Sequence, residues 1–318
     1  MTKKIAIVDM GTNTFHLLIA EANGNGSYSI THRDRLVVKI GQGGINQGYI
    51  TEEGINRALG AMQNFKDIIA QEDVQRTYAF GTSALRNASN KDEIMRRIKN
   101  ATGIVPTIIS GDVEAEYIYL GVRYGLDLEN KKSLVVDIGG GSVECILCDN
   151  SQIFWKESFE IGAQRLLEKF QKSDPITRDE INRLDHYFEK ALVSLLETLR
   201  EYKPTTLIGA SGSFDTLSDI FCFQNNIQKN SAETEIPLSI RGFYEIYQDL
   251  ISKNREQRLQ IPGMIEMRVD MIVVASCLIH YILSRHTFNR IRVSPYSLQE
   301  GVLASLIQTP KSTESASP

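Results

Sequence analysis

The most constraining feature of this chain is a short segment that occurs twice. Residues 7–19 (IVDMGTNTFHLLI) and residues 135–147 (VVDIGGGSVECIL) align without a gap. Each has an apolar run, Asp, an apolar residue, Gly, three small or polar residues and a second apolar run. This pattern predicts a β-hairpin whose turn glycine supplies a positive φ and lets a ligand approach the backbone N–H groups. Two such hairpins predict a duplicated fold with facing loops.

A simpler interpretation is that both segments are hairpin turns without a function. It leaves unexplained why each turn has an acidic residue, Asp9 or Asp137, shortly before its glycine.

The flanking sequence alternates strand and helix patterns, which is typical of an α/β fold. We expect strands at 5–8, 15–20, 28–40, 77–80, 105–109, 133–136, 143–148, 153–159, 207–209 and 291–293. We expect helices at 51–69, 91–101, 113–122, 163–170, 177–202, 241–254, 268–283 and 297–307. The predicted units are an N-terminal lobe (1–124), a C-terminal lobe (125–308), whose last helix can pack back on the first lobe, and a disordered polar tail (309–318).

Composition limits the partners of the 318-residue chain. With 35 basic and 39 acidic residues the net charge is -4, so nothing global favours nucleic acid or an anionic membrane. The apolar run at 271–283 is shorter than a membrane span and is expected to be a buried helix, in the core or in a homodimer interface. Four scattered cysteines and no apparent secretion signal predict a cytoplasmic protein. The five histidines lack metal-ligand spacing, so we expect any metal to be an oxygen-ligated cation.

Three glycine-containing loops are candidate phosphate sites. In the second repeat, successive backbone N–H groups and a hydroxyl can hold a phosphate, and the predicted residues are Gly139, Gly140, Gly141 and Ser142. The first repeat offers Gly11, Thr12, Asn13 and Thr14, and a later turn before a helix offers Gly212 and Ser213, unless it is only a helix cap. The carboxylates beside the two repeats suit Mg²⁺, and they are Asp9, Asp137 and Glu144.

Two further segments follow predicted strands. In the first, Arg86 has a planar guanidinium that suits bidentate phosphate binding, although a solvated helix position would also explain it. In the second, residues 110–116 (SGDVEAE) begin a helix, and Asp112 and Glu114 lie in its first turn. Capping accounts for Asp112 but does not require Glu114.

Seven motifs in order now carry a resemblance to a known family. They are DMGTNTFH, GTSALRNA, ISGDVEAEYIYLGV, VVDIGGGSVE, IGAQRL, GASGS and MRVDMI, spanning about residues 5 to 307. The set resembles the exopolyphosphatase and guanosine pentaphosphate phosphatase (Ppx/GppA) family. The resemblance implies the duplicated fold of actin, sugar kinases and heat-shock ATPases, which is ribonuclease H-like, with two lobes and a central cleft. It also implies Mg²⁺-dependent release of terminal phosphate from polyphosphate or from the guanosine pentaphosphate of the stringent response.

The resemblance also implies roles for individual residues. Glu114 matches the family's catalytic base, Arg86 its phosphate-contacting arginine, and Asp137 and Glu144 its metal-linked acidic residues. Longer members have an added C-terminal helical region that helps to grip long polyphosphate, and the resemblance implies that this chain is like the shorter members, which do without it.

The chain departs from the family pattern at a few positions. Thr12 and Thr14 replace the usual serines, Glu116 replaces a frequent arginine, and Gln299 replaces an arginine. The last two changes motivate one alternative, a non-catalytic nucleotide or alarmone sensor. A second alternative on the same fold is an ATP-dependent kinase of small molecules. The sequence does not choose between polyphosphate and the alarmone as substrate.

Overall fold

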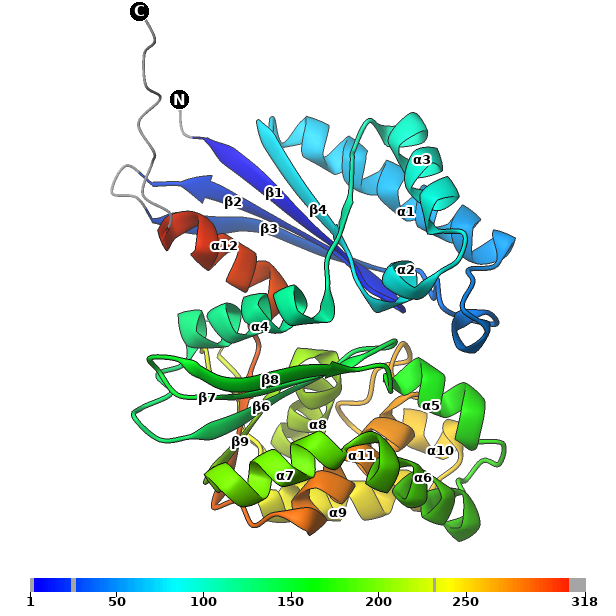
Figure 1. Cartoon of the computed structure of the whole chain (residues 1–318), viewed down its shortest axis with the longest axis vertical. Helices are drawn as coiled ribbons and strands as arrows, with labels where there is room; N and C mark the ends of the chain where they lie inside the picture. The colour runs from blue at the N-terminus through cyan, green and yellow to red at the C-terminus, as the bar shows by residue number, and fades with distance from the viewer. Residues whose placement is uncertain (1–2, 24–26, 231–232, 309–318) are drawn as a thin grey trace, which may run out of the picture.

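The computed structural model describes residues 3–23, 27–230 and 233–308, and shows two α/β lobes, one above the other in Figure 1. The tail predicted to be disordered (309–318) lies outside the described residues. Each lobe is built on a five-stranded sheet, among the residues described. The α/β class and the actin-like duplicated architecture expected from the sequence are confirmed by the structure.

The N-terminal sheet has the strand order β3-β2-β1-β4-β5. Its strands are β1 (Lys4–Met10), β2 (Thr14–Ala22), β3 (Tyr28–Val37), β4 (Arg76–Gly81) and β5 (Thr107–Ile108). The first repeat forms the antiparallel hairpin β1–β2, and β4 pairs with β1 in parallel. The ends of β1 and β4 therefore meet at one edge of the sheet, which points toward the second lobe.

The C-terminal sheet repeats this arrangement with the order β10-β9-β6-β7-β8. Its strands are β6 (Ser133–Ile138), β7 (Val143–Cys148), β8 (Ile153–Phe159), β9 (Thr206–Ala210) and β10 (Arg290–Ser294). The second repeat forms the antiparallel hairpin β6–β7, with β9 parallel to β6. Both hairpins predicted from the repeated sequence are present, and each lies at the centre of its sheet.

Helices cover both sheets. Those of the first lobe are η1 (Ile45–Gln47), α1 (Glu52–Gln71), α2 (Ser83–Asn87), α3 (Lys91–Thr102) and α4 (Gly111–Gly125). The later ones are α5 (Ala163–Phe170), α6 (Arg178–Ala191), α7 (Val193–Tyr202), α8 (Ser211–Gln224), α9 (Ile240–Ser252), α10 (Arg255–Leu259), α11 (Ile272–Arg285) and α12 (Leu298–Gln308). Local signals fix several starts. Thr51, for example, caps α1 by accepting a hydrogen bond from the Gly54 N–H.

The last helix returns to the first lobe. α12 packs against α4 and β1, and its Leu298, Val302 and Leu303 are buried in the same core as residues of both helix and sheet. In Figure 1, α12 and α4 lie together between the two sheets. The chain therefore passes between the lobes twice, once after α4 and once before α12.

Three expectations need correction. The helix expected at 177–202 is two helices, because Leu192 is buried with φ -111° and ψ 26°, so that the apolar faces of α6 and α7 both reach the core. The short helices α2 and α10 were not expected. The helix expected at 268–283 begins at Ile272, and it is enclosed in the core of the second lobe, which favours the core role over an interface role.

The structure also shows the length of the apolar helices and the state of the four cysteines. Within the described ranges, none of the helices combines the length and the apolar character that a bilayer span requires. All four cysteines are buried free thiols.

Candidate active site

A cavity of about 600 Å³ lies between the lobes, and both hairpin turns open into it. Its lining comes from both halves of the chain. From the first half it includes Asp9, Gly11, Thr12, Asn13, Thr14, His16, Arg33, Arg35, Ser83 and Glu114. From the second half it includes Asp137, Gly139, Gly140, Gly141, Ser142, Glu144, Ser211, Gly212, Asp215, Arg268, Gln299 and Glu300.

Strand register brings the two repeats into equivalent positions. Asp9 pairs with His16 across the first hairpin, and Asp137 pairs with Glu144 across the second. Paired residues project from the same face of a sheet, so each hairpin presents two polar side chains to the cavity. His16 occupies the position of Glu144 in the repeat, and this is the main chemical difference between the two turns.

The glycines of the turns are needed for space, and our expectation of a positive φ is wrong. Among the described glycines, left-handed φ values occur at Gly43, Gly48, Gly103 and Gly263. A Cβ on Gly11 would instead lie 2.8 Å from the carbonyl oxygen of Thr14. The tight hairpin turn therefore excludes a side chain there.

The two turns also touch each other across the cleft. A Cβ on Gly140 would lie 2.5 Å from the side-chain Nδ2 of Asn13, and one on Gly141 would lie 2.5 Å from Oγ of Ser83. These glycines let the backbones of the two lobes approach closely, which brings their N–H groups to one cavity. The loops are arranged as a pair that can enclose a phosphate from two sides.

Buried carboxylates gather in this cavity, among them Asp9, Glu114, Asp137 and Glu144. Burial raises the pKa of Asp9 to about 7, and the charges of Asp137 and Glu144 add to the effect. Burial also raises the pKa of Glu144 well above its usual range, with Glu114 and Asp137 contributing, and burial raises the pKa of Asp137. Oδ1 of Asp9 is buried without a hydrogen-bond partner among the described residues. A cation in the cavity would stabilise the ionised forms of these carboxylates.

Asp137 is held from two sides by hydroxyls. Ser211 donates to its Oδ1 at 2.6 Å, and Ser297 donates to its Oδ2. Ser211 has φ +69°, a left-handed conformation that non-glycine residues seldom adopt. Strain of this kind occurs where a side chain must take a particular position, and here it directs the hydroxyl to the carboxylate.

The candidate base Glu114 is in contact with the arginine predicted beside it. Nη1 of Arg86 donates to Oε2 of Glu114 at 2.8 Å, and Nη2 donates to Oε1 of Glu160 at 3.0 Å. Burial raises the pKa of Glu114, while Arg86 opposes the rise. Glu160 also accepts hydrogen bonds from Ser83 (2.5 Å) and Arg165 (3.1 Å), so it links the two lobes.

A glycine allows the helix of Glu114 to approach the other lobe. A Cβ on Gly111 would lie 2.7 Å from Oγ of Ser158 in β8. The Ser158 hydroxyl donates to Oε1 of Glu144 at 2.6 Å. The start of α4 and the acidic hairpin are therefore packed together, and Glu114 and Glu144 face one cavity.

The structure brings most of the predicted site residues together. The cavity lining contains all three candidate metal ligands, Glu114, both sets of turn residues and Gly212. Two predicted residues lie outside the lining. The guanidinium of Arg86 is hydrogen-bonded to Glu114 and Glu160, and Ser213 is buried in α8.

The lining also contains buried charged residues that the sequence did not point to, among them Arg268 and Asp215. Arg268 precedes α11, and burial lowers its pKa. Asp215 lies in α8, and burial raises its pKa to about 7. Nε of Arg268 and Oδ1 of Asp215 have no hydrogen-bond partner among the described residues. The motifs MRVDMI and GASGS were noted, but nothing in a single sequence shows that these segments converge.

The two positions that depart from the family pattern have clear contacts. Glu116 forms an ion pair with Lys156 of β8, so a lysine from the second lobe supplies positive charge near α4. Nε2 of Gln299 donates to the backbone carbonyl of Ile7 at 2.7 Å, which fixes α12 to β1. Neither side chain blocks the cavity.

The fold and the site together define a class of protein. Two duplicated α/β lobes, with paired hairpin turns and carboxylates facing one cavity, match the actin-like architecture expected from the sequence. A model of the Ppx/GppA phosphatase family matches residues 18–309. The chain therefore belongs to the Ppx/GppA phosphatase family.

Known proteins of similar sequence and structure extend over nearly the whole chain. A putative exopolyphosphatase of Haemophilus influenzae is 28% identical, covering 96% of this chain and 91% of that protein. Exopolyphosphatase 2 of Mycobacterium tuberculosis is 27% identical, covering 95% and 98%. The crystal structure of an exopolyphosphatase from Cytophaga hutchinsonii has a TM-score of 0.93 at 41% identity, covering 96% and 98%. An Aquifex aeolicus family member has a TM-score of 0.77 at 25% identity, covering 96% and 97%.

Proposed function

We propose that this protein is a Mg²⁺-dependent exopolyphosphatase that releases terminal orthophosphate from inorganic polyphosphate. The observation that carries the proposal is the convergence of Glu114, both hairpin turns and three further carboxylates on one cavity between the lobes. Membership of the Ppx/GppA family and the exopolyphosphatase names of the similar proteins support it. Guanosine pentaphosphate is a second candidate substrate, because it has the same phosphoanhydride chemistry.

Glu114 is the proposed general base. It is buried at the cavity wall, and burial favours its neutral form, so its conjugate base is a good proton acceptor near neutral pH. In the proposed reaction Glu114 orients a water molecule and takes its proton as the water oxygen attacks the terminal phosphorus. The bridging oxygen leaves with the shortened chain, while backbone N–H groups of the turns stabilise the equatorial oxygens.

Asp9, Asp137 and Glu144 would hold Mg²⁺ in part through water molecules. The fit rests on the unpartnered Oδ1 of Asp9 and on the raised pKa values of the three buried carboxylates, both of which a divalent cation would relieve. No three acidic, histidine or cysteine side chains in the described part of the chain stand close enough to enclose a metal by themselves. This suits Mg²⁺, which takes one or two carboxylates and otherwise water and substrate oxygens. When bound, it would neutralise charge developing on the phosphoryl oxygens.

A phosphate-release assay tests the proposal. The substrates are polyphosphates of several lengths, guanosine pentaphosphate and ATP, each with and without Mg²⁺. We expect orthophosphate from polyphosphate without an added acceptor, and only with the metal. Transfer of phosphate from ATP to an added small-molecule acceptor, with no orthophosphate released, would identify a kinase. Tight binding of guanosine pentaphosphate without release from any substrate would identify a sensor.

The base is tested by Glu114→Gln. Removing a general base costs about 10²–10⁴-fold in rate, so we expect turnover to fall by that amount while polyphosphate binding persists. The measurements are turnover in the release assay and affinity by calorimetry. Near-normal turnover in this variant would refute the assignment of Glu114. The cytoplasmic location expected from the sequence remains part of this proposal, and the free buried cysteines are consistent with it.

A further inference from the structure

Three residues lie side by side across strands β1, β2 and β3 of the N-terminal sheet, and the last of them is an arginine. His16 pairs with both Asp9 and Arg35, so the three side chains project from the same face of the sheet. Neighbouring strands are about 4.8 Å apart, which places Arg35 about 10 Å from Asp9. All three residues line the cavity. A chain of a few phosphates can span this distance.

Arg35 differs from a second arginine on the same strand in how its charge is compensated. Arg33, two positions earlier on the same face, pairs with Glu300 of α12 and lies 5.6 Å from the ring centroid of Tyr296. Within the described residues, the guanidinium of Arg35 has no hydrogen bond or ion pair. The carboxylate of the adjacent Asp34 accepts a hydrogen bond from the backbone N–H of Arg35 instead, at 2.7 Å.

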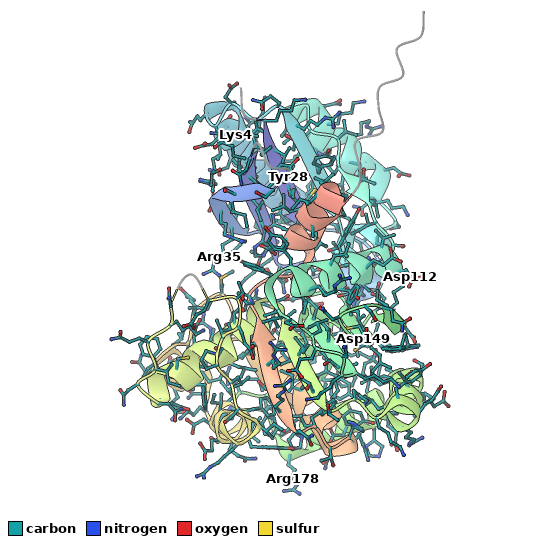
Figure 2. All side chains as sticks on the ribbon, turned by 90° about the vertical axis from the view of Figure 1, so that its left-hand side faces the viewer. Lys4, Tyr28, Arg35, Asp112, Asp149 and Arg178 are labelled. Atoms are coloured by element: carbon teal, nitrogen blue, oxygen red, sulfur yellow. The ribbon has the colours of Figure 1, made fainter. Side chains whose placement is uncertain are left out.

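Arg35 and the start of α4, which carries Glu114, lie on opposite sides of the cleft. Glu114 lies near the start of α4, and Figure 2 shows Asp112 of the same helical turn and Arg35 on opposite sides of the waist between the lobes. Arg35 is also close enough to Arg268 for their positive charges to repel, which adds to the effect of burial on Arg268. An anion between these two arginines would remove that repulsion.

We propose that Arg35 is a binding subsite for an inner phosphate of the substrate, the second or third from the phosphoryl group that is removed. The inference rests on the proposed function for the identity of the substrate. The terminal phosphoryl lies beside Glu114, and the rest of the chain extends across the sheet, past His16, to Arg35. Inorganic polyphosphate and the phosphates of a guanosine nucleotide share this chemistry, so either can reach the subsite.

The test is equilibrium binding in the Glu114→Gln background with Mg²⁺, measured by calorimetry. The ligands are pyrophosphate, tripolyphosphate, longer polyphosphates and guanosine pentaphosphate. We expect Arg35→Gln to weaken binding of the longer polyphosphates by about tenfold, the size of one charge-assisted hydrogen bond. Pyrophosphate binding should change by less than about twofold, and Arg35→Lys should restore most of the affinity for long chains, because a lysine also binds phosphate. A loss for guanosine pentaphosphate as well would show that the nucleotide reaches the subsite.

Arg33→Gln is the matched control, because it removes the same charge from the same face of the same strand. We expect its effect on affinity to be independent of chain length, and circular dichroism checks that both variants are folded. Equal losses in the two variants, or an Arg35→Gln loss that is the same for pyrophosphate and long chains, would overturn the proposal. If wild-type protein releases no phosphate, the proposed function fails, while the binding series still decides the role of Arg35.

Discussion

The two hairpin turns have the same backbone and opposite chemistry. In the C-terminal lobe, Asp137 is paired with Glu144, and the hydroxyls of Ser211, Ser297 and Ser158 hold this pair of carboxylates. In the N-terminal lobe, the equivalent pair is Asp9 and His16. Burial lowers the pKa of His16 to about 4, with the neighbouring arginines contributing, so the imidazole is neutral at pH 7.

This difference shows how a duplicated fold can divide one reaction between its halves. The C-terminal hairpin concentrates negative charge that suits a cation, and the hydroxyls around it fix the carboxylates in position. The N-terminal hairpin has His16 at the position of the second carboxylate, and His16 in turn pairs with Arg35, which suits an anion. A polyanionic substrate and its metal require both kinds of surface, and duplication supplied two similar surfaces that could diverge.

Of the changes that test this comparison, we expect the largest effect on turnover from replacing the equivalent residues Glu144 and His16, one at a time, by glutamine. Glu144→Gln should reduce turnover by about 10²–10³-fold at a fixed low Mg²⁺ concentration, the usual loss for a group that stabilises transition-state charge. It should also raise the Mg²⁺ concentration needed for half-maximal activity. His16→Gln should change the Mg²⁺ requirement by less than about threefold, because a neutral imidazole is not expected to bind this ion. Titration of phosphate release with Mg²⁺ measures both. Equal Mg²⁺ requirements in the two variants would contradict the division of roles.

A second effect is expected on stability, because burying carboxylates in the C-terminal wall favours their protonated forms. Burial raises the pKa of Asp215 from 3.8 to about 7, and nearby Arg268 and Lys229 oppose the shift while Asp219 and Asp137 add to it. The folded state then binds more protons than the unfolded state between about pH 4 and 7, so this group lowers stability as pH rises through that window.

We therefore expect Asp215→Asn to flatten the decline of unfolding free energy between pH 4 and 7 by about 4 kcal/mol, at about 1.4 kcal/mol for each pKa unit. Urea denaturation at several pH values without metal measures it. Asp219→Asn is the matched control, since this carboxylate lies on the same helix but is partly exposed and paired with Lys229. If unfolding free energy falls with pH as steeply in Asp215→Asn as in the wild type, then burial of this carboxylate does not cause the decline.

The smallest effect concerns the contact between the lobes. Glu160 joins Ser83 and Arg86 of the first lobe to Arg165 of the second, and its side chain is 39% exposed. Glu160→Gln should reduce the unfolding free energy by about 1 kcal/mol, the upper range for a partly exposed ion pair. Glu116→Gln breaks another pair between the lobes, Glu116 with Lys156, away from Arg86, and is the control. Because Glu160 shares Arg86 with the proposed base, Glu160→Gln should also change turnover, whereas Glu116→Gln should not.

Much of the fold could be predicted because its signals are local. The repeated segment, the capping Thr51 and the alternating strands each act within about twenty residues, so their structural consequences can be read in order along the chain. The sequence predicted one helix at 177–202 because the break at Leu192 is caused by a tertiary contact. Leu192 is buried in the core of the second lobe, where α6 and α7 meet. No proline or glycine marks it in the sequence.

The residues at the hairpin turns could be predicted from the sequence, whereas the other residues that line the cavity could not. Asp9, Asp137 and Glu144 are adjacent to recognisable turns, whereas Arg268, Asp215 and Arg35 reach the cavity from segments whose contacts are set by the tertiary fold. The reason for the turn glycines was also missed. Positive φ is a local property that sequence reasoning favours, but close approach between Gly140 and Asn13 exists only after the two lobes have met.

The return of α12 to the first lobe affects how the protein is made. α12 completes the core that α4, β1 and β2 share, and it contributes Gln299 to the backbone of Ile7. A ribosome adds about 5–20 residues per second, so the N-terminal lobe waits on the order of ten seconds or more for this helix. Until α12 is made, the residues of β1, β2 and α4 that it packs against lack this part of their core. The N-terminal lobe is first in the sequence, and it is among the last parts of the protein to be completed.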